Sequence, residues 1–173
     1  MKEITTRKQA AEFLGIPEEK VLHFGRYVNN DWRYREINKG YHLFRRINNK
    51  WIELTKNIDA RYIFSYLNKD WKYLDEKGYE HLFRKIGGKW IELTIKVNAI
   101  YAHSYDNGDW SYKDEKGYSH LYRFMNNKWI KLNAWKKAKT VWSYDNYDWD
   151  YTDDNHNCYK FDKKNNLIKK YEL

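Results

Sequence analysis

The sequence contains very few of the residues that cross-link or interrupt a chain. It has one cysteine, Cys158, and one proline, Pro17, among 173 residues. A single cysteine excludes an internal disulfide and a zinc site built from several cysteines. A membrane-spanning helix needs about 18 consecutive apolar residues, and no such run occurs. The amino terminus also lacks the apolar stretch of a secretory signal. We therefore expect a cytoplasmic protein with no membrane partner, in the host-cell cytoplasm if a phage encodes it.

The average composition would favour a disordered chain. Charged residues make up 33%, the net charge is +9 and the mean hydropathy is -1.06, a combination typical of disorder. However, nine Trp, 17 Tyr and seven Phe supply 19% of the residues. Since each ring can bury roughly 150–250 Å², the sequence predicts a folded protein whose core is largely aromatic.

Two sequence blocks repeat along the chain. The first has the form Asn-x-Asp-Trp-x-Tyr and recurs every 39 residues, beginning at Asn29, Asn68, Asn107 and Asn146. The second has the form His-Leu-Phe/Tyr-Arg, followed by Trp-Ile-Glu/Lys-Leu. It recurs with the same spacing, beginning at His42, His81 and His120. Such a fixed period is the signature of a repeat architecture.

Each unit carries two turn signals between aromatic and β-branched runs. The first lies within the Asn-x-Asp block, most clearly at Asn107-Gly108. The second lies before the Trp-Ile block, at Asn48-Asn49, Gly87-Gly88 and Asn126-Asn127. Such dipeptides form the tight turns of β-hairpins, and the flanking runs suit strands. Each unit is therefore expected to contain two hairpins.

The repeats predict a mainly β protein with a short N-terminal helical cap. Four tandem 39-residue hairpin-pair units form either an open twisted meander, which tolerates any copy number, or a small propeller. The fourth copy loses the second block, as expected of the end of an open array, so we favour the meander. The expected domains are a helical segment, 1–21, and a β-repeat domain, 22–173. Its units are about 22–59, 60–98, 99–137 and 138–173.

Residues 6–17 precede the repeats and have a helix start and a glycine stop. The string Gln-Ala-Ala-x-x-Leu-Gly-Ile, from Gln9 to Ile16, resembles the opening of excisionase-type and MerR-type helix-turn-helix domains. That resemblance implies a first helix and turn of a DNA-reading element. Because Tyr27 already belongs to the repeat, a recognition helix has little room. We expect the segment to cap the first exposed edge strand.

No catalytic motif accompanies the repeats. Nucleophile motifs, glycine-rich phosphate loops and metal-ligand strings are missing from the sequence, so we predict a protein that is not an enzyme and has neither cofactor nor metal. We expect the recurrent acids to stabilise turns and not to act as catalytic acids. They are Asp31, Asp70, Asp109 and Asp148. The recurrent histidines would converge as metal ligands in a closed ring. In an open array each would form a hydrogen bond with a neighbouring turn. We expect this second role, and not metal binding, for His42, His81 and His120.

The Trp-Ile blocks indicate a candidate binding surface. In Trp51-Ile52-Glu53-Leu54, strand alternation puts Trp with Glu on one face. Burying Glu unpaired is costly, so Ile and Leu are predicted to face the core. A row of rings interleaved with cations is typical of single-strand nucleic-acid binders, although Arg stems packed on rings for stability give the same pattern. The predicted binding residues are Trp51, Trp90, Trp129, Arg45, Arg84, Arg123, Arg46 and Lys85.

A second resemblance concerns the Trp-x-Tyr-x-Asp-x-x-Gly hairpins. The segments 71–78 and 110–117 look like the hairpins of choline-binding and cell-wall-binding repeats, whose period is shorter. The resemblance implies an aromatic cage for a quaternary amine or a glycan.

Two functions follow. The leading hypothesis is a non-enzymatic intracellular binding protein. Its partner is a nucleic acid, or a nucleoprotein or nuclease complex, engaged through a basic aromatic repeat surface. One specific form is a phage or mobile-element anti-defence inhibitor, similar in class to anti-CRISPR proteins. The alternative is a carbohydrate or cell-wall binding repeat module.

Overall fold

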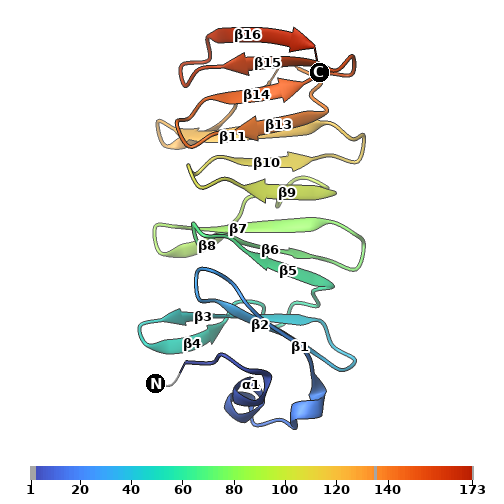
Figure 1. Ribbon diagram of the computed structural model, residues 1–173, viewed down its shortest axis with the longest axis vertical. Helices are drawn as coiled ribbons and strands as arrows, with labels where there is room; N and C mark the ends of the chain where they lie inside the picture. Colours follow the sequence, from blue (N-terminus) through green and yellow to red (C-terminus); the bar gives the residue numbers. More distant parts are fainter. Residues whose placement is uncertain (1–2, 135, 173) are drawn as a thin grey trace. The chain divides into compact units, whose positions relative to one another are not determined.

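The computed structural model describes residues 3–134 and 136–172. Across these residues it contains one α-helix, one 3-10 helix and sixteen β-strands (Figure 1). In chain order the elements are α1 (Arg7–Leu14), η1 (Glu18–Lys20), β1 (Val21–Arg26), β2 (Trp32–Glu36), β3 (Tyr41–Ile47), β4 (Lys50–Glu53), β5 (Tyr62–Ser65), β6 (Trp71–Leu74), β7 (Glu80–Ile86), β8 (Lys89–Glu92), β9 (Tyr101–Ser104), β10 (Trp110–Lys113), β11 (Ser119–Met125), β12 (Lys128–Lys131), β13 (Thr140–Ser143), β14 (Trp149–Thr152), β15 (Asn157–Phe161) and β16 (Leu167–Glu172).

The strands are arranged as antiparallel meanders. They form four four-stranded sheets, with the orders β1-β2-β3-β4, β5-β6-β7-β8, β9-β10-β11-β12 and β13-β14-β15-β16. Each sheet therefore corresponds to one 39-residue unit of the sequence. The prediction of a mainly β fold, built from tandem hairpin pairs and preceded by one helical segment, is confirmed.

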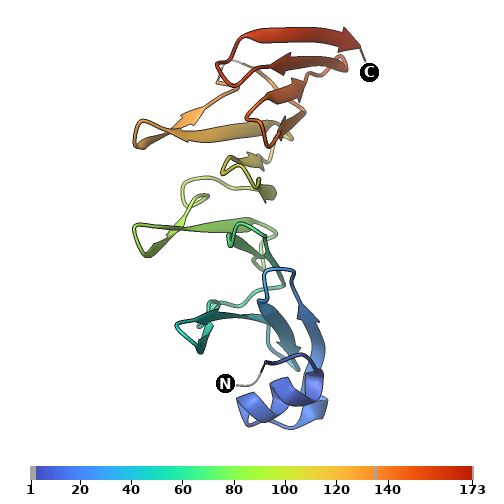
Figure 2. The same ribbon diagram turned by 60° about the vertical axis from the view of Figure 1, so that its left-hand side comes forward.

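The chain divides after Gly78 into two compact units, and each is described by itself. In the first unit β3 packs against β5, and in the second β7 packs against β9 and β11 against β13. One backbone hydrogen bond accompanies each of these contacts, at 2.7 Å in every case: Tyr41 N donates to Ala60 O, Glu80 N to Ala99 O and Ser119 N to Ala138 O. Figure 2 shows the β3–β4 hairpin of the first unit bending away from β1 and β2.

The predicted turns occur where the sequence places them. Both residues of the β3–β4 turn have positive φ, 47° at Asn48 and 61° at Asn49, as a two-residue type I′ hairpin requires. Each Asn-x-Asp turn has one positive-φ residue after its first Asn, for example Gly108 at 90°. The Asn side chain closes this turn, because Asn107 Oδ1 accepts a hydrogen bond from Asp109 N at 2.8 Å.

Replacing Gly108 with valine should lower the free energy of unfolding by about 1–2 kcal/mol, because a β-branched residue is strained at positive φ. Gly108→Asn is the matched control, since the equivalent Asn30 already adopts φ 68°. Chemical denaturation of the two variants checks this. Equal stabilities would contradict the turn geometry.

The N-terminal helix covers the face of the first sheet (Figure 1). Thr6 caps α1 by accepting from Gln9 N at 3.2 Å, and Gly15 ends it in the left-handed conformation. Phe13 lies edge-on to Trp32 and to Phe44, with ring centroids 6.0 Å apart in both pairs. These two rings belong to β2 and β3, so the cap protects the sheet's face, whereas the sequence predicted protection of its edge. After α1, residues 15–26 form only η1 and β1. This segment therefore lacks the second helix, which reads DNA in a helix-turn-helix domain.

The cores are aromatic, as the composition predicted. In the first unit Trp32 is fully buried and stacks on Phe44 at 4.3 Å, within a cluster that includes Ala10 and Ala11 of α1. In the second unit Trp149 stacks on Phe161 at 4.4 Å. Ring pairs of this kind add to the stabilisation that buried area provides.

Candidate functional site

Arg45, predicted to contact a ligand, instead binds an acid inside the first unit. Its guanidinium donates to both carboxylate oxygens of Asp31, with Nε at 3.0 and 2.9 Å and Nη2 at 2.5 Å. The side chains are 9% and 2% exposed. Two further bonds reach the next repeat, to Ser65 Oγ at 3.1 Å and to Lys69 O at 2.6 Å. Asp31 is therefore a buried ion-pair partner in addition to a turn residue.

The second unit repeats this network. Arg123 donates to Asp109 at 3.0 and 2.7 Å and to Tyr147 O at 2.7 Å, and Ser143 Oγ donates to Asp109. The half-buried Arg84 donates to Gly108 O and Ser104 Oγ. Buried Asp carboxylates and backbone carbonyls occupy donors of Arg45 and Arg123, so the structure gives these two predicted binding residues partners inside the protein. Arg84 likewise donates two hydrogen bonds to the next repeat.

The predicted orientation of the Trp-Ile block is wrong. Trp51 is half-buried and lies edge-on to Trp32 at 6.0 Å, whereas Ile52 is 43% exposed. The reason is that Glu53 is not unpaired: its carboxylate lies 2.7 Å from Nδ1 of His42. A satisfied Glu shares the inward face with Trp, and the isoleucine turns outward.

The other predicted rings behave similarly. Trp129 lies edge-on to Trp110 at 6.1 Å, and Trp90 is half-buried. The second unit brings Arg84, Arg123 and Trp129 around one pocket of about 420 Å³. There the Arg84 guanidinium lies 5.3 Å from the Trp129 ring centroid, which fits the packing of cations on rings for stability.

Arg46 and Lys85, also predicted to contact a ligand, are exposed. In the strand register they lie opposite Trp51 and Trp90. A ring paired with an exposed cation therefore exists in two repeats, but the cation is one residue beyond the Arg that the motif highlighted. Strand alternation explains the difference: in a strand, successive side chains point to opposite faces.

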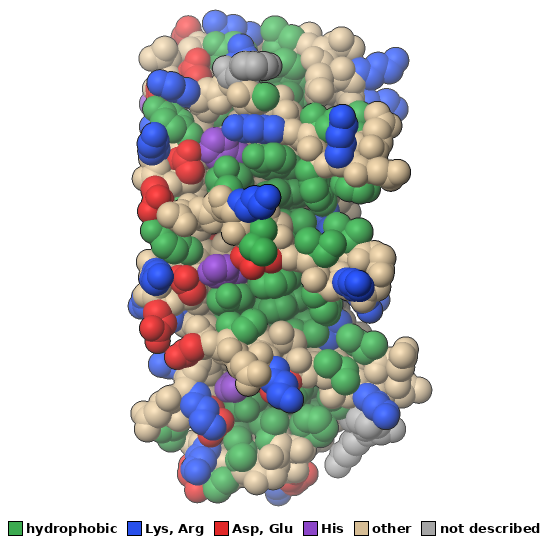
Figure 3. Space-filling model, turned by 180° about the vertical axis from the view of Figure 1, so that it is seen from behind, with side chains coloured by type: hydrophobic (Ala, Val, Ile, Leu, Met, Phe, Trp, Pro, Cys, Tyr) green, Lys and Arg blue, Asp and Glu red, His purple; other side chains and the backbone are tan. Residues whose placement is uncertain are grey.

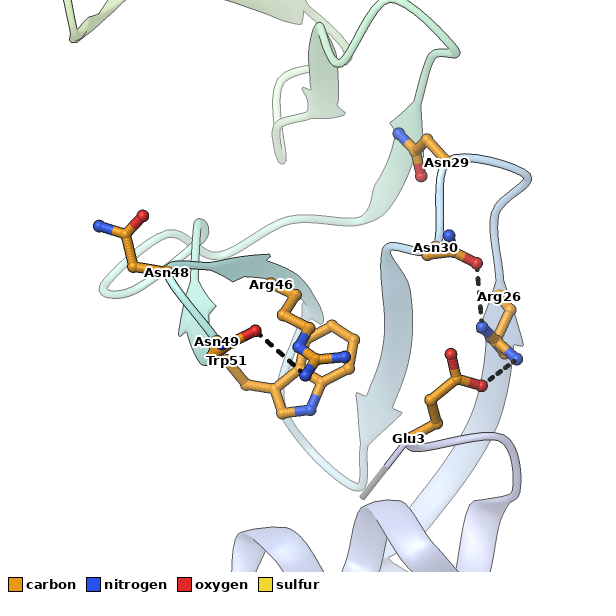
Figure 4. A pocket seen from close by; sticks show the side chains of 8 residues that line it. All are labelled: Glu3, Arg26, Asn29, Asn30, Arg46, Asn48, Asn49 and Trp51. Carbon is orange, nitrogen blue, oxygen red and sulfur yellow. Dashed lines mark hydrogen bonds and ion pairs between the residues drawn. The ribbon is translucent and has the colours of Figure 1, made fainter. Parts of the chain in front are cut away.

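A polar pocket in the first unit joins Arg46 and Trp51 (Figure 4). It has a volume of about 450 Å³ and is lined by Glu3, Arg26, Asn29, Asn30, Arg46, Asn48, Asn49 and Trp51. Arg26 Nη2 donates to Asn30 Oδ1 at 3.1 Å, and Arg46 Nη2 donates to Asn49 Oδ1 at 3.2 Å. These bonds orient the two guanidinium groups and leave most of their five N–H donors each for a ligand.

Sequence reasoning missed Arg26, Asn30 and Asn49 as pocket residues. The two asparagines carried a signal, since both lie in turns that the repeat identifies. Arg26 ends β1 and belongs to no repeated motif, so only the folded β1–β2 hairpin places it in the pocket.

A third pocket, also in the second unit, is aromatic. It has a volume of about 440 Å³, and its lining residues include Tyr101, His103, Tyr105 and Trp142. The Trp142 ring lies 5.5 Å from Tyr105 and 6.0 Å from His103. We call this pocket the aromatic groove. Figure 3 shows apolar side chains at the surface between Lys and Arg side chains.

The recurrent histidines bond carboxylates. His42 and His81 lie 2.7 Å from Glu53 and Glu92, and His120 lies 2.8 Å from Asp114, in the turn before β11. Burial lowers the pKa of His120 despite the opposing influence of Asp114. Among the residues that the structure describes, no group of three or more His, Cys, Asp and Glu side chains is arranged to hold a metal ion.

The structure contains no membrane-crossing helix within residues 3–134 and 136–172, since none there is sufficiently long and apolar. No family model matches the chain, and no curated protein matches it. Among solved structures, the calcium-binding protein regucalcin from Agrobacterium tumefaciens is similar with a TM-score of 0.41 and 11% identity. The alignment covers 87% of this chain and 59% of the regucalcin chain.

Proposed function

We propose that this protein binds a phosphate-bearing chain, a single-stranded nucleic acid or the nucleic-acid part of a nucleoprotein complex, without catalysing a reaction. The observation that carries the proposal is the polar pocket, where Arg26 and Arg46 lie with the Trp51 ring. Guanidinium groups hold phosphate oxygens by paired hydrogen bonds, and bases stack on the faces of aromatic rings.

The charge around the pocket supports the same ligand class. Glu3 is the one acid among its lining residues, and it lies 3.9 Å from the Arg26 guanidinium with 64% of its side chain exposed. Lys50, at the end of the β3–β4 turn, is exposed beside the lining residues Asn48 and Asn49. Together with the net charge of +9, these cations attract a polyanion by releasing its counterions.

The same surface fits an anti-defence role in a phage-infected cell. An inhibitor of a nuclease complex can bind the nucleic acid of that complex or mimic the nucleic acid. A mimic needs negative charge, so a basic inhibitor is better suited to binding the nucleic acid. The proposal therefore includes a cytoplasmic location, where such complexes act.

Salt-dependent binding to a labelled single-stranded oligonucleotide tests the proposal. If each guanidinium contacts one phosphate, Arg26→Ala and Arg46→Ala should each reduce the slope of log affinity against log salt by about one. Lys56→Ala is the matched control: it removes one exposed cation of the same unit outside the pocket and should change the slope less.

Three results would count against the proposal. Equal slopes for Lys56→Ala and the two arginine variants would indicate diffuse charge attraction without a site. Undetectable oligonucleotide binding at low salt would remove nucleic acid as the ligand. Binding to a glycan without salt dependence would favour the carbohydrate module.

A further inference from the structure

The first unit contains a guanidinium group held in a box of aromatic rings. Arg33 Cζ lies 5.3 Å from the ring centroid of Tyr27, 5.6 Å from that of Tyr41 and 5.2 Å from that of Tyr62. Its Nη1 donates to the carbonyl oxygen of Ile63 at 2.7 Å, and the Tyr27 hydroxyl donates to the same oxygen at 2.6 Å. This arrangement combines cation–π attraction with a directed hydrogen bond.

The aromatic groove of the second unit is formed by the residues that are equivalent to this box two repeats later in the sequence. One hydrogen bond of the box is kept: the Tyr105 hydroxyl donates to Val141 O at 3.1 Å, as the Tyr27 hydroxyl does to Ile63 O. The internal cation is absent, since Ser111 occupies the position of Arg33. Two smaller residues, Ser119 and Thr140, stand where the first unit has Tyr41 and Tyr62. Together these changes open the volume of about 440 Å³.

New rings line the opened groove. Trp142, His103 and Tyr101 stand where the first unit has Phe64, Gly25 and His23. Trp142 is 52% exposed and Tyr101 is 50% exposed, so both rings contribute accessible surface to the groove. A planar cation would therefore find walls comparable to those around Arg33.

Charges near the groove are mixed. Asp150 lies opposite Trp142 in the β13–β14 register and accepts from the Tyr144 hydroxyl. Glu80 accepts from Ala102 N in β9. Lys113 lines the groove, but its equivalent, Arg35, lies 5.9 Å from the Tyr41 ring in the box that holds Arg33. A cation at that rim is thus compatible with a bound guanidinium.

We infer that the aromatic groove binds the guanidinium group of an arginine side chain from a partner protein. Val141 O has one lone pair left after accepting from Tyr105, as Ile63 O has for Arg33. Guanidinium suits the groove better than an ammonium, because it is planar, stacks on rings and is weakly hydrated.

The test uses titration of the full chain with N-acetyl-arginine amide, followed by Trp fluorescence and NMR chemical shifts. We expect saturable binding at roughly millimolar concentration and none of the neutral isostere N-acetyl-citrulline amide. Ser111→Arg should abolish binding by filling the groove with an internal guanidinium. This variant should fold, since equivalent positions hold Arg33 and Lys72. Trp142→Ala, at an exposed ring, should weaken binding by roughly threefold or more.

Equal binding of the citrulline and arginine amides, or unchanged binding by folded Ser111→Arg, would overturn the inference. So would no saturable binding of the arginine amide to the unmodified protein at about 10 mM. The variants Arg26→Ala and Arg46→Ala leave this groove intact, so its failure and that of the oligonucleotide pocket are distinguishable.

Discussion

Replacing Arg123 with alanine is expected to lower the free energy of unfolding by about 3–5 kcal/mol, because it leaves the buried Asp109 carboxylate without its cation. Asp109 is 1% exposed, and Arg123 bonds both its oxygens and the carbonyl of Tyr147 in the next repeat. The substitution therefore removes the ion pair and one of the hydrogen bonds between the two repeats. Denaturant unfolding followed by Trp fluorescence measures the loss.

Two further variants separate the ion pair from general charge effects. Lys128→Ala removes an exposed cation near the end of the same strand pair and should change stability by less than about 0.5 kcal/mol. The double variant Arg123→Met, Asp109→Leu should recover much of the loss, because it removes the unpaired charge together with its partner. Similar stabilities for Arg123→Ala and Lys128→Ala would contradict the network.

Replacing Trp32 with alanine is expected to cost about 3–5 kcal/mol, the range for removing a buried large aromatic side chain. Trp32 is fully buried and lies at the centre of the first core, against Phe44 of β3, Phe13 of α1 and Trp51 of β4. Its removal should loosen the helix from the sheet as well as the sheet itself. Far-UV and near-UV circular dichroism during thermal unfolding would report both changes.

Val28→Ala provides the control for Trp32. Val28 is 86% exposed in the turn that precedes β2, so its truncation should change stability by less than about 0.5 kcal/mol. A Trp32 variant as stable as the Val28 variant would show that the ring does not anchor the core.

The candidate binding residues were only partly predictable. The repeat highlights Arg45, Arg84 and Arg123 because they recur, but recurrence marks structural roles as strongly as ligand contacts. Arg45 and Arg123 each pair with a buried Asp and bond the following repeat. Arg26 and Ser111 carried no such signal, since one lies outside the motifs and the other departs from its equivalents.

By itself the sequence determined the repeat period, the turns and the β class. These follow from local chemistry: Asn and Gly accept positive φ, and alternating aromatic residues suit strands. Tertiary structure decided which face each side chain occupies. His42 satisfies Glu53 and turns Trp51 inward, and Asp31 draws Arg45 into the interior. Both outcomes depend on partners 11 to 14 residues away in the chain, where the cost of burying a charge is offset only after the strands have paired.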